Sequence, residues 1–354
     1  MRILDLYIGR IIATTTFLTL AVLVSVSSII KFVEQMRAVG RGNYDLVHAA
    51  LYSLYSMPRD IEIFFPMAAL IGGLIGLGMM ANNSELVVMQ ASGMSKLKII
   101  KSVMKTALIL IVLSMAIGEW LAPQGEATAR ELRAQAISSG SLISAKNGVW
   151  AKDGDLIVNI NEVADTGTLK KLSFFKFDDN LEMKRWLTAE SAVWVGQKWL
   201  LSKVEIANFT PQLITRINQE SYEWKSSLTP DKLGVVTVKP EALSLRGLVS
   251  YLDYLNENQQ DTSRYMLAFW RKLMQPITVA VMLLVALSYI FGPLRSVSMG
   301  ARIMMGIGTG ICYDFINRMF GSMSLTFNFS PFLGAVLPSL LFVMVAVYLI
   351  RRKV

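Results

Sequence analysis

Residues 11–30 of the chain read IIATTTFLTLAVLVSVSSII and contain no charged side chain. An α-helix rises about 1.5 Å per residue, so twenty such residues match the roughly 30 Å of hydrocarbon in a bilayer. The run is longer than the apolar core of a signal peptide, and no small-x-small cleavage site follows it. The stretch therefore predicts a membrane-spanning helix.

The rest of the sequence carries the same signal. Its 354 residues are 53% hydrophobic and 17% charged, whereas soluble domains carry about 25% charged residues. Further apolar segments lie at 63–81, 103–122, 273–294, 301–320 and 331–350. We therefore expect an α-helical membrane protein with six transmembrane helices, arranged as two groups of three.

Basic residues near the ends of these spans set their orientation, because Lys and Arg are enriched on the cytoplasmic side. With six spans, four basic segments fall on one side; they contain Arg2, Arg10, Lys96, Lys98, Lys101, Lys105, Arg295, Arg302, Arg351, Arg352 and Lys353. That side is predicted to be cytoplasmic. The region between the third and fourth spans then projects from the opposite face of the membrane.

This intervening region, 126–265, has a different composition. It contains 17 basic and 18 acidic residues, and the rest of the chain contains 18 basic and 8 acidic ones. The excess positive charge therefore belongs to the membrane-associated parts, where it is typical of loops that face anionic lipid rather than of a nucleic-acid surface.

Alternating apolar and polar residues within this region predict β-structure. The expected strands lie at 149–161, 169–179, 185–196, 198–210 and 216–227, with turns at Asp-Gly, Asp-Asn and Gly-Gln pairs. Short strands at this spacing favour a sandwich or jelly roll. After Pro240, four leucines at helical spacing predict an amphipathic helix that leads back to the membrane; they are Leu245, Leu248, Leu252 and Leu255. The expected domains are a three-span segment at 1–125, an inserted β-jelly-roll-like domain at 126–265 and a second three-span segment at 266–354.

The predicted cytoplasmic loop after the second span contains a short helix at about 84–93. Asn82 can cap it with Glu85 as its third residue, and Leu86, Met89 and Gln90 give it one face. Such a helix suits a groove on a cytoplasmic partner, where Glu85 would pair with a basic residue. A helix lying along the membrane interface fits the pattern equally well.

Basic residues also gather at the opposite, outer ends of the first and third spans. They are Lys31, Arg37 and Arg41, followed later by Arg130 and Arg133. Extended basic side chains at this depth suit the phosphate or carboxylate groups of an amphiphile whose acyl chains stay in the lipid. Snorkelling to ordinary headgroups is the alternative. Because the positive-inside rule disfavours basic residues on this side, the pattern favours a ligand site.

Two further features lie within or beside predicted spans. Asp314 and Arg318 stand four residues apart, as in an internal ion pair, and Arg318 could also face a substrate. Phe64 could line a hydrophobic cavity, with packing against lipid as the alternative.

Recognisable catalytic sequences are absent. The chain has no GxxxxGK[ST], GxSxG or HExxH sequence, and its single cysteine, Cys312, and single histidine, His48, exclude an intrachain disulfide and disfavour Cys- or His-based metal sites. We expect no catalytic residues, no metal and no cofactor in this chain, so that a partner would supply any energy for work.

Several segments, in order along the chain, carry a family resemblance. They are FFPMAAL (64–70), SELVVMQASG (84–93), AIGEWLAPQGE (116–126), RAQA (133–136), LTPDKLGVV (228–236) and FGPLRSVSMG (291–300). With these segments the chain resembles the LptF/LptG permease family of the lipopolysaccharide-export ABC transporter, and the last four point to the LptG branch.

The resemblance implies a specific assembly. It implies a partner permease similar to LptF, two copies of an LptB-like cytoplasmic ATPase that binds ATP and Mg, and a single-span LptC-like subunit. It maps the family's coupling helix onto 84–93, with Glu85 at the acidic position, and its lipopolysaccharide contacts onto Lys31 and Arg37. Ala38 stands where some relatives have a second basic residue, and Arg41 is its possible substitute.

The expected function is therefore that of a non-catalytic transmembrane subunit in the bacterial inner membrane, with its β domain in the periplasm. It would extract lipopolysaccharide and pass it to a periplasmic bridge towards the outer membrane. Two alternatives stay open at this point: an ABC subunit for another lipid or a lipoprotein, and a membrane-anchored periplasmic sensor.

Overall fold

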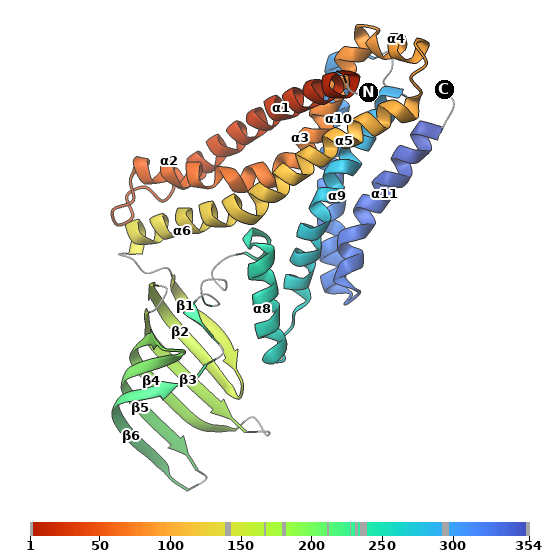
Figure 1. The fold of residues 1–354 in the computed structure, drawn as a ribbon. Helices are drawn as coiled ribbons and strands as arrows, with labels where there is room; N and C mark the ends of the chain where they lie inside the picture. Colours follow the sequence, from red (N-terminus) through yellow and green to blue (C-terminus); the bar gives the residue numbers. More distant parts are fainter. Residues whose placement is uncertain are drawn as a thin grey trace. The chain divides into compact units, whose positions relative to one another are not determined.

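The computed structural model describes residues 3–138, 143–165, 168–178, 182–210, 212–226, 228–230, 233, 239–291 and 297–351 (Figure 1). The chain divides into two compact units. The first, which we call the helical unit, comprises Met1–Lys31, Ser56–Gly125 and Met266–Val354, and the second, the β unit, comprises Phe32–Tyr55 and Glu126–Tyr265.

Long helices form the helical unit. They are α1 (Ile3–Met36), α3 (Met57–Asn82), α5 (Lys96–Ala116), which the π-helix η1 (Ile117–Leu121) and α6 (Ala122–Ser138) prolong, α9 (Ser263–Phe291), α10 (Met299–Thr326) and α11 (Pro331–Arg351). Three of them, α1, α6 and α9, also contain residues of the β unit. A short helix, α4 (Glu85–Ala91), follows α3 and lies at the same end of the bundle as the start of α1 and the end of α11 (Figure 1).

Among the described residues, five helices are long and apolar enough to cross a membrane. They are α1, α3, the continuous segment Lys96–Ile137, α9 and α11, so the chain is a multi-pass membrane protein. The fifth predicted span corresponds to α10, which has 28 residues but is less apolar because it carries Arg302, Asp314 and Arg318. Its membrane crossing stays a prediction.

The helices differ in how far they bury their apolar stretches within the chain. For α3, 67% of that stretch is buried, but for α1 only 22%. Small residues let α1 approach α3 closely, because a Cβ added at Gly72 would meet the Thr16 backbone and one at Gly76 would meet the Thr15 hydroxyl at 2.9 Å. The other sides of α1 remain exposed, with Leu18 at 69%, so α1 offers an apolar surface that no described residue of the chain covers.

In the described part of the β unit, six antiparallel strands form a sheet in the order β1-β2-β3-β4-β5-β6. They are β1 (Ile143–Asp153), β2 (Leu156–Asp165), β3 (Thr168–Phe177), β4 (Met183–Val195), β5 (Lys198–Phe209) and β6 (Ile214–Trp224). Each described strand pairs with its neighbour in sequence. The inserted β domain is thus present, and the crossed strand order of a jelly roll stays a prediction.

The turns explain where the strand predictions succeeded and where they did not. The predicted run 149–161 is a hairpin rather than one strand, because Gly154 adopts φ +59° between β1 and β2. Gly196 and Gln197 adopt φ +54° and +77° between β4 and β5, as the type I′ turn of a two-residue hairpin requires. The predicted Asp-Asn turn at 179–180 lies outside the described residues.

The predicted amphipathic helix is confirmed as α8 (Leu245–Glu257), preceded by the short helix η2 (Pro240–Ala242). Ser244 caps α8 by accepting a hydrogen bond from the Gly247 amide at 3.0 Å. Its buried face packs in the core of the sheet, and the Tyr254 hydroxyl donates to the Lys152 carbonyl at 2.8 Å. Burial raises the pKa of the Tyr254 phenol, so the hydroxyl remains a donor at neutral pH.

Tryptophans of the sheet and the segment that follows β6 form one core. Trp199 has no exposed surface, and its indole Nε1 donates to the Leu228 carbonyl at 2.8 Å. Its ring contacts Trp194 edge-on and stacks near Trp224, with centroids 5.1 and 6.2 Å away. These contacts join β4, β5 and β6 at one end of the sheet.

Candidate functional site

Lys31 ends the part of α1 that belongs to the helical unit. Its Nζ lies 2.6 Å from Oδ1 of Asp60 in α3, whose other oxygen accepts a hydrogen bond from Ser27 at 3.1 Å. The Asp60 side chain is only 3% exposed, but that of Lys31 is 26% exposed. The predicted lipid-binding cation is therefore held in place by a buried carboxylate and still reaches the surface of the chain.

A second buried carboxylate, Glu62, lies two residues further along α3. It forms ion pairs with Arg59 at 2.6 Å and with Lys272 of α9 at 3.2 Å, and its side chain is 3% exposed. The Gln275 amide donates to the Glu62 carbonyl at 2.7 Å. On the η1 side, a Cβ at Gly118 would meet Glu62 Oε1 at 2.8 Å, so glycine makes room there for the carboxylate. This network joins α3 to α9.

The other predicted basic residues belong to the β unit. Arg37 and Arg41 follow α1 and are exposed. Arg130 pairs with Glu126 at 2.8 Å, one turn away on α6. Arg133 lies over the Tyr52 ring of α2 (Leu46–Tyr55), with its guanidinium carbon 5.9 Å from the ring centroid.

The loop after α1 is fastened to α6 within the same unit. The Asn43 amide donates to the Ala136 carbonyl at 2.8 Å, and Gly42, at φ +56°, passes so close that a Cβ would lie 2.6 Å from that carbonyl oxygen. Burial raises the pKa of the Tyr44 phenol, and the nearby charge of Arg133 acts in the opposite direction. The structure thus brings the Arg41 loop and the Arg133 helix together.

The predicted partner-coupling helix is α4, but its outward face differs from the prediction. Leu86 and Met89 are 4% and 7% exposed because they pack into the core of the helical unit. Val87 and Val88 are exposed instead, at 49% and 64%. Gln90, predicted to share a face with Leu86 and Met89, is exposed. A partner would therefore meet the valines and Gln90, not Leu86 and Met89.

The ends of α4 also differ from the predicted capping box. Asn82 is the last residue of α3, and Ser84, at φ +62°, precedes α4 without a side-chain cap, so that Glu85 is the first residue. The Glu85 carboxylate accepts hydrogen bonds from the Tyr7 hydroxyl at 3.0 Å and from Asn83 at 3.3 Å. The Tyr7 contact ties α4 to α1.

A buried arginine of α10 binds Asn82 at the end of α3. Arg302 of α10 has no exposed surface, and its Nη1 donates to the Asn82 side-chain oxygen at 3.0 Å and to the Gly78 carbonyl at 2.9 Å. A buried guanidinium thus fixes the end of α3, directly before α4.

The remaining predicted site residues lie elsewhere in the helical unit. Arg318 pairs with Asp314 at 2.8 Å, but the side chains are 73% and 56% exposed. The ion pair is therefore confirmed, whereas its internal position is wrong: this face of α10 points away from the chain's own core. Phe64 packs against the core of the helical unit and is partly exposed.

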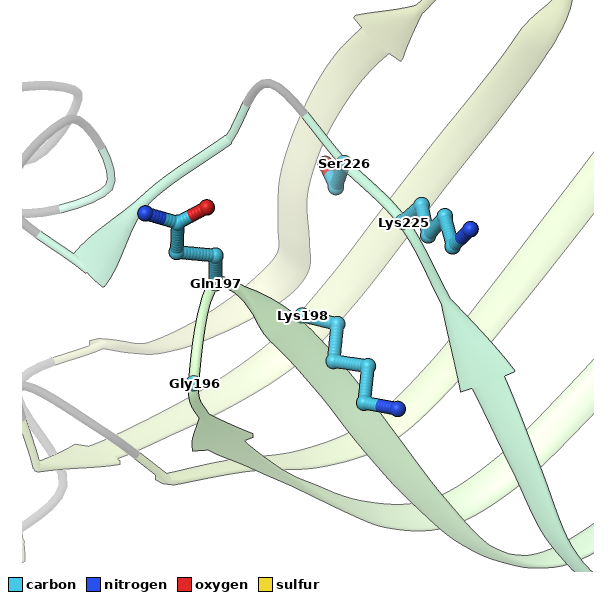
Figure 2. Close-up of a pocket in the computed structure, with 5 residues that line it drawn as sticks. All are labelled: Gly196, Gln197, Lys198, Lys225 and Ser226. Atoms are coloured by element: carbon cyan, nitrogen blue, oxygen red, sulfur yellow. The ribbon is translucent and has the colours of Figure 1, made fainter.

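A pocket of about 470 Å³ lies at the β4–β5 turn and is lined by Gly196, Gln197, Lys198, Lys225 and Ser226. Figure 2 shows the two lysine side chains extending to the same side, away from Gln197. Lys198 is already paired with Glu223 at 2.5 Å. None of the predicted site residues lines this pocket.

Comparison with known proteins identifies the class of transporter. Residues 6–352 match the family described as lipopolysaccharide export system permease LptF/LptG. The chain belongs to this family. The lipopolysaccharide export system permease protein LptG of Escherichia coli (strain K12) is 49% identical over 354 residues, covering 99% of this chain and 98% of that protein. The protein of the same name from Haemophilus influenzae is 47% identical over 352 residues, again covering 99% and 98%.

As a member of the LptF/LptG family, the chain is a permease subunit of an export system. Four residues of the two buried ion-pair groups on α3 were not predicted as site residues: Arg59, Asp60, Glu62 and Lys272. Arg59 and the two acidic residues directly precede the predicted span at 63–81. Their pairing with α1 and α9 could not be read from the sequence, because it depends on how helices distant in sequence pack.

Proposed function

We propose that this chain is a transmembrane subunit of an ABC transporter that extracts lipopolysaccharide from the bacterial inner membrane and passes it to a periplasmic bridge towards the outer membrane. The family match over residues 6–352 carries this proposal. The exposed apolar side of α1 supports it, because such a surface needs lipid or a partner helix to cover it.

The partners follow from the same proposal. A second, LptF-like permease faces this chain across a cavity bounded by α1 and α10, whose outward faces are exposed. Two LptB-like ATPases bind beneath, and a single-span LptC-like subunit packs near α1. ATP and Mg are bound by the ATPases, and this chain contributes no catalytic residue and no metal site.

The site residues take two roles in this proposal. Lys31, Arg37, Arg41, Arg130 and Arg133 bind the phosphorylated headgroup in the periplasmic leaflet, with Phe64 and Arg318 facing the lipid in the cavity. Glu85, Val87, Val88 and Gln90 contact the ATPase.

The hydrogen-bond pattern suggests how motion at α4 would reach the cavity. Tyr7 links Glu85 to α1, and Arg302 links α10 to the end of α3, immediately before α4. The two helices that bound the proposed cavity are therefore both connected to the short helix that meets the ATPase. ATP-driven closure of the ATPase pair would displace α4, draw α1 and α10 inward and expel the lipid.

The first test is to purify the tagged chain in mild detergent from its native host and identify the accompanying proteins and lipids by mass spectrometry. The proposal expects an ABC ATPase, a paralogous permease and lipopolysaccharide. Recovery of an ATPase with a different lipid would change the substrate assigned to the transporter. Recovery of the chain without any ATPase would favour a periplasmic sensor.

A second test addresses the headgroup contact. In Lys31→Asp the site loses one positive charge and gains a negative one, so we expect photo-crosslinking to lipopolysaccharide to fall at least about tenfold, with the ATPase still bound. Lys184→Asp, on the exposed surface of the sheet, is the matched control and should crosslink as the wild type. Unchanged crosslinking in Lys31→Asp would remove Lys31 from the site.

A further inference from the structure

The Lys31–Asp60 ion pair has two unequal ends. Asp60 is enclosed, with a 3% exposed side chain, one oxygen 2.6 Å from Lys31 and the other bonded to Ser27. Lys31 is 26% exposed. A carboxylate buried in this way is costly unless it stays paired, so Asp60 is fixed and the ammonium group of Lys31 is the accessible end.

This geometry lets a second anion reach Lys31 without displacing Asp60 from its place. An ammonium group has three N–H donors, and Asp60 is the one partner of Lys31 in the described part of the chain. A phosphate that approaches from the exposed side would bind Lys31 and would at the same time be repelled by the Asp60 carboxylate behind it. The attraction is therefore that of a partly neutralised cation.

The neighbouring carboxylate is arranged differently. Glu62 is enclosed by Arg59 and Lys272, whose side chains are only 14% and 9% exposed. An external anion has less access to that pair than to Lys31. Asp60 is therefore the carboxylate placed to act on a headgroup held by Lys31.

We propose that Asp60 is a built-in counterion that competes with the anionic headgroup for Lys31, so that the subunit holds its lipid loosely enough to release it. This inference rests on the proposed function. Asp60 is a positioning residue: it acts on the lipid through the charge and location of the Lys31 ammonium group. The group that Lys31 would bind is a phosphate carried by an amphiphile.

The test compares the whole transporter complex carrying Asp60→Asn with the wild type. Asparagine keeps the shape and a hydrogen-bonding group but removes the negative charge. We expect about tenfold more lipopolysaccharide to remain bound after detergent washing, and slower ATP-driven release. In a Lys31→Ala background, Asp60→Asn should not change retention, because the cation on which it acts is gone.

A matched control is available on α1, the helix that carries Lys31. Asp5 pairs with Lys105 at 2.8 Å near the other end of α1, so Asp5→Asn removes a carboxylate–lysine pair away from the proposed site. Its retention should equal that of the wild type. Equal or lower retention in an assembled Asp60→Asn complex would overturn the inference.

The charge-swapped pair Lys31→Asp with Asp60→Lys separates a structural role from a lipid-binding one, and also applies where Asp60→Asn alone fails to assemble. It restores an ion pair between α1 and α3 but places the negative charge at the exposed end. We expect assembly with at least tenfold less retained lipid; wild-type retention in this variant would overturn the inference. Absence of lipopolysaccharide from the wild-type complex would instead contradict the proposed function itself.

Discussion

At the scale of single residues, buried charged side chains join helices through ion pairs and hydrogen bonds. Asp60, Glu62 and Arg302 are each at most 2% exposed, and each one bonds a partner on another helix. Charges in a membrane bundle are retained where they pair or face a polar site. The three residues therefore mark the contacts that fix α1, α9 and α10 to α3.

Arg302 provides a prediction at this scale. Removing its guanidinium in Arg302→Ala leaves the Asn82 side chain and the Gly78 carbonyl without their donor, so we expect the free energy of unfolding to fall by about 2 kcal/mol. ATP hydrolysis should continue while lipid release declines, because α10 is no longer tied to the end of α3. Thermal unfolding, ATPase and lipid-release measurements on the complex check this.

The control for that experiment is Arg351→Ala, which removes an exposed arginine at the end of α11 and should leave all three measurements unchanged. If Arg302→Ala lowers ATP hydrolysis and lipid release in equal proportion, α10 is not the element through which the two are linked.

The site residues show what a sequence can and cannot reveal. Lys31, Arg133 and Glu85 were predicted as site residues from charge, spacing and resemblance, which are properties of single segments. Their partners Asp60, Tyr52 and Tyr7 come from other helices, and nothing in a one-dimensional pattern states which helices meet. For the same reason Leu86 and Met89 were assigned to a partner although they pack inside the chain.

At the scale of elements, α4 is the part of the helical unit whose role can be tested most directly. Glu85 begins α4 and is bonded to Tyr7 and Asn83. In Glu85→Lys a positive charge replaces the negative one in the proposed ATPase groove, so we expect ATP hydrolysis that depends on the complex to fall at least tenfold. Pull-down of the ATPase with the tagged chain and phosphate release check this.

Glu182→Lys is the matched control, since it makes the same charge change on the sheet, where Glu182 lies at 70% side-chain exposure beside Lys184. It should behave as the wild type. Normal export by the Glu85→Lys variant would rule out α4 as the docking element.

Element boundaries were predictable to different degrees. The helices and α8 follow from long apolar runs and leucine spacing, so they were found. The hairpin at 149–161 was read as one strand because apolar and polar residues alternate across its turn. The Asp153-Gly154 pair, a typical turn sequence, lies within that run, and the positive φ of Gly154 marks the break in the structure. The pairing order of the strands depends on contacts between segments and was not available from the sequence.

At the scale of the whole molecule, the proposed topology places α4 in the cytoplasm and the sheet in the periplasm. It can be checked with single cysteines in a Cys312→Ser background, because Cys312 is the only cysteine. Ser221 in β6 and Ser92 after α4 are both exposed. With a membrane-impermeant maleimide applied to spheroplasts, Ser221→Cys should be labelled, and Ser92→Cys should be labelled only after the membrane is opened.

The Cys312→Ser chain without an introduced cysteine is the negative control for this experiment. Labelling of Ser92→Cys, and not Ser221→Cys, in intact spheroplasts would invert the orientation derived from the basic residues and remove the periplasmic route for the lipid.

The neighbour-by-neighbour order of the sheet also bears on how the protein is made. Because the described strands pair with those adjacent in sequence, contacts within the sheet close over short stretches of chain, which favours rapid folding. The sheet can therefore form hairpin by hairpin from β1 to β6 while the chain is still being synthesised. The contacts from Leu228 to Trp199 and from Tyr254 to Lys152 close over longer stretches and come from residues made after β6. Among the described strands, the order of synthesis and the order of pairing are the same, so each strand finds its partner in the segment made directly before or after it.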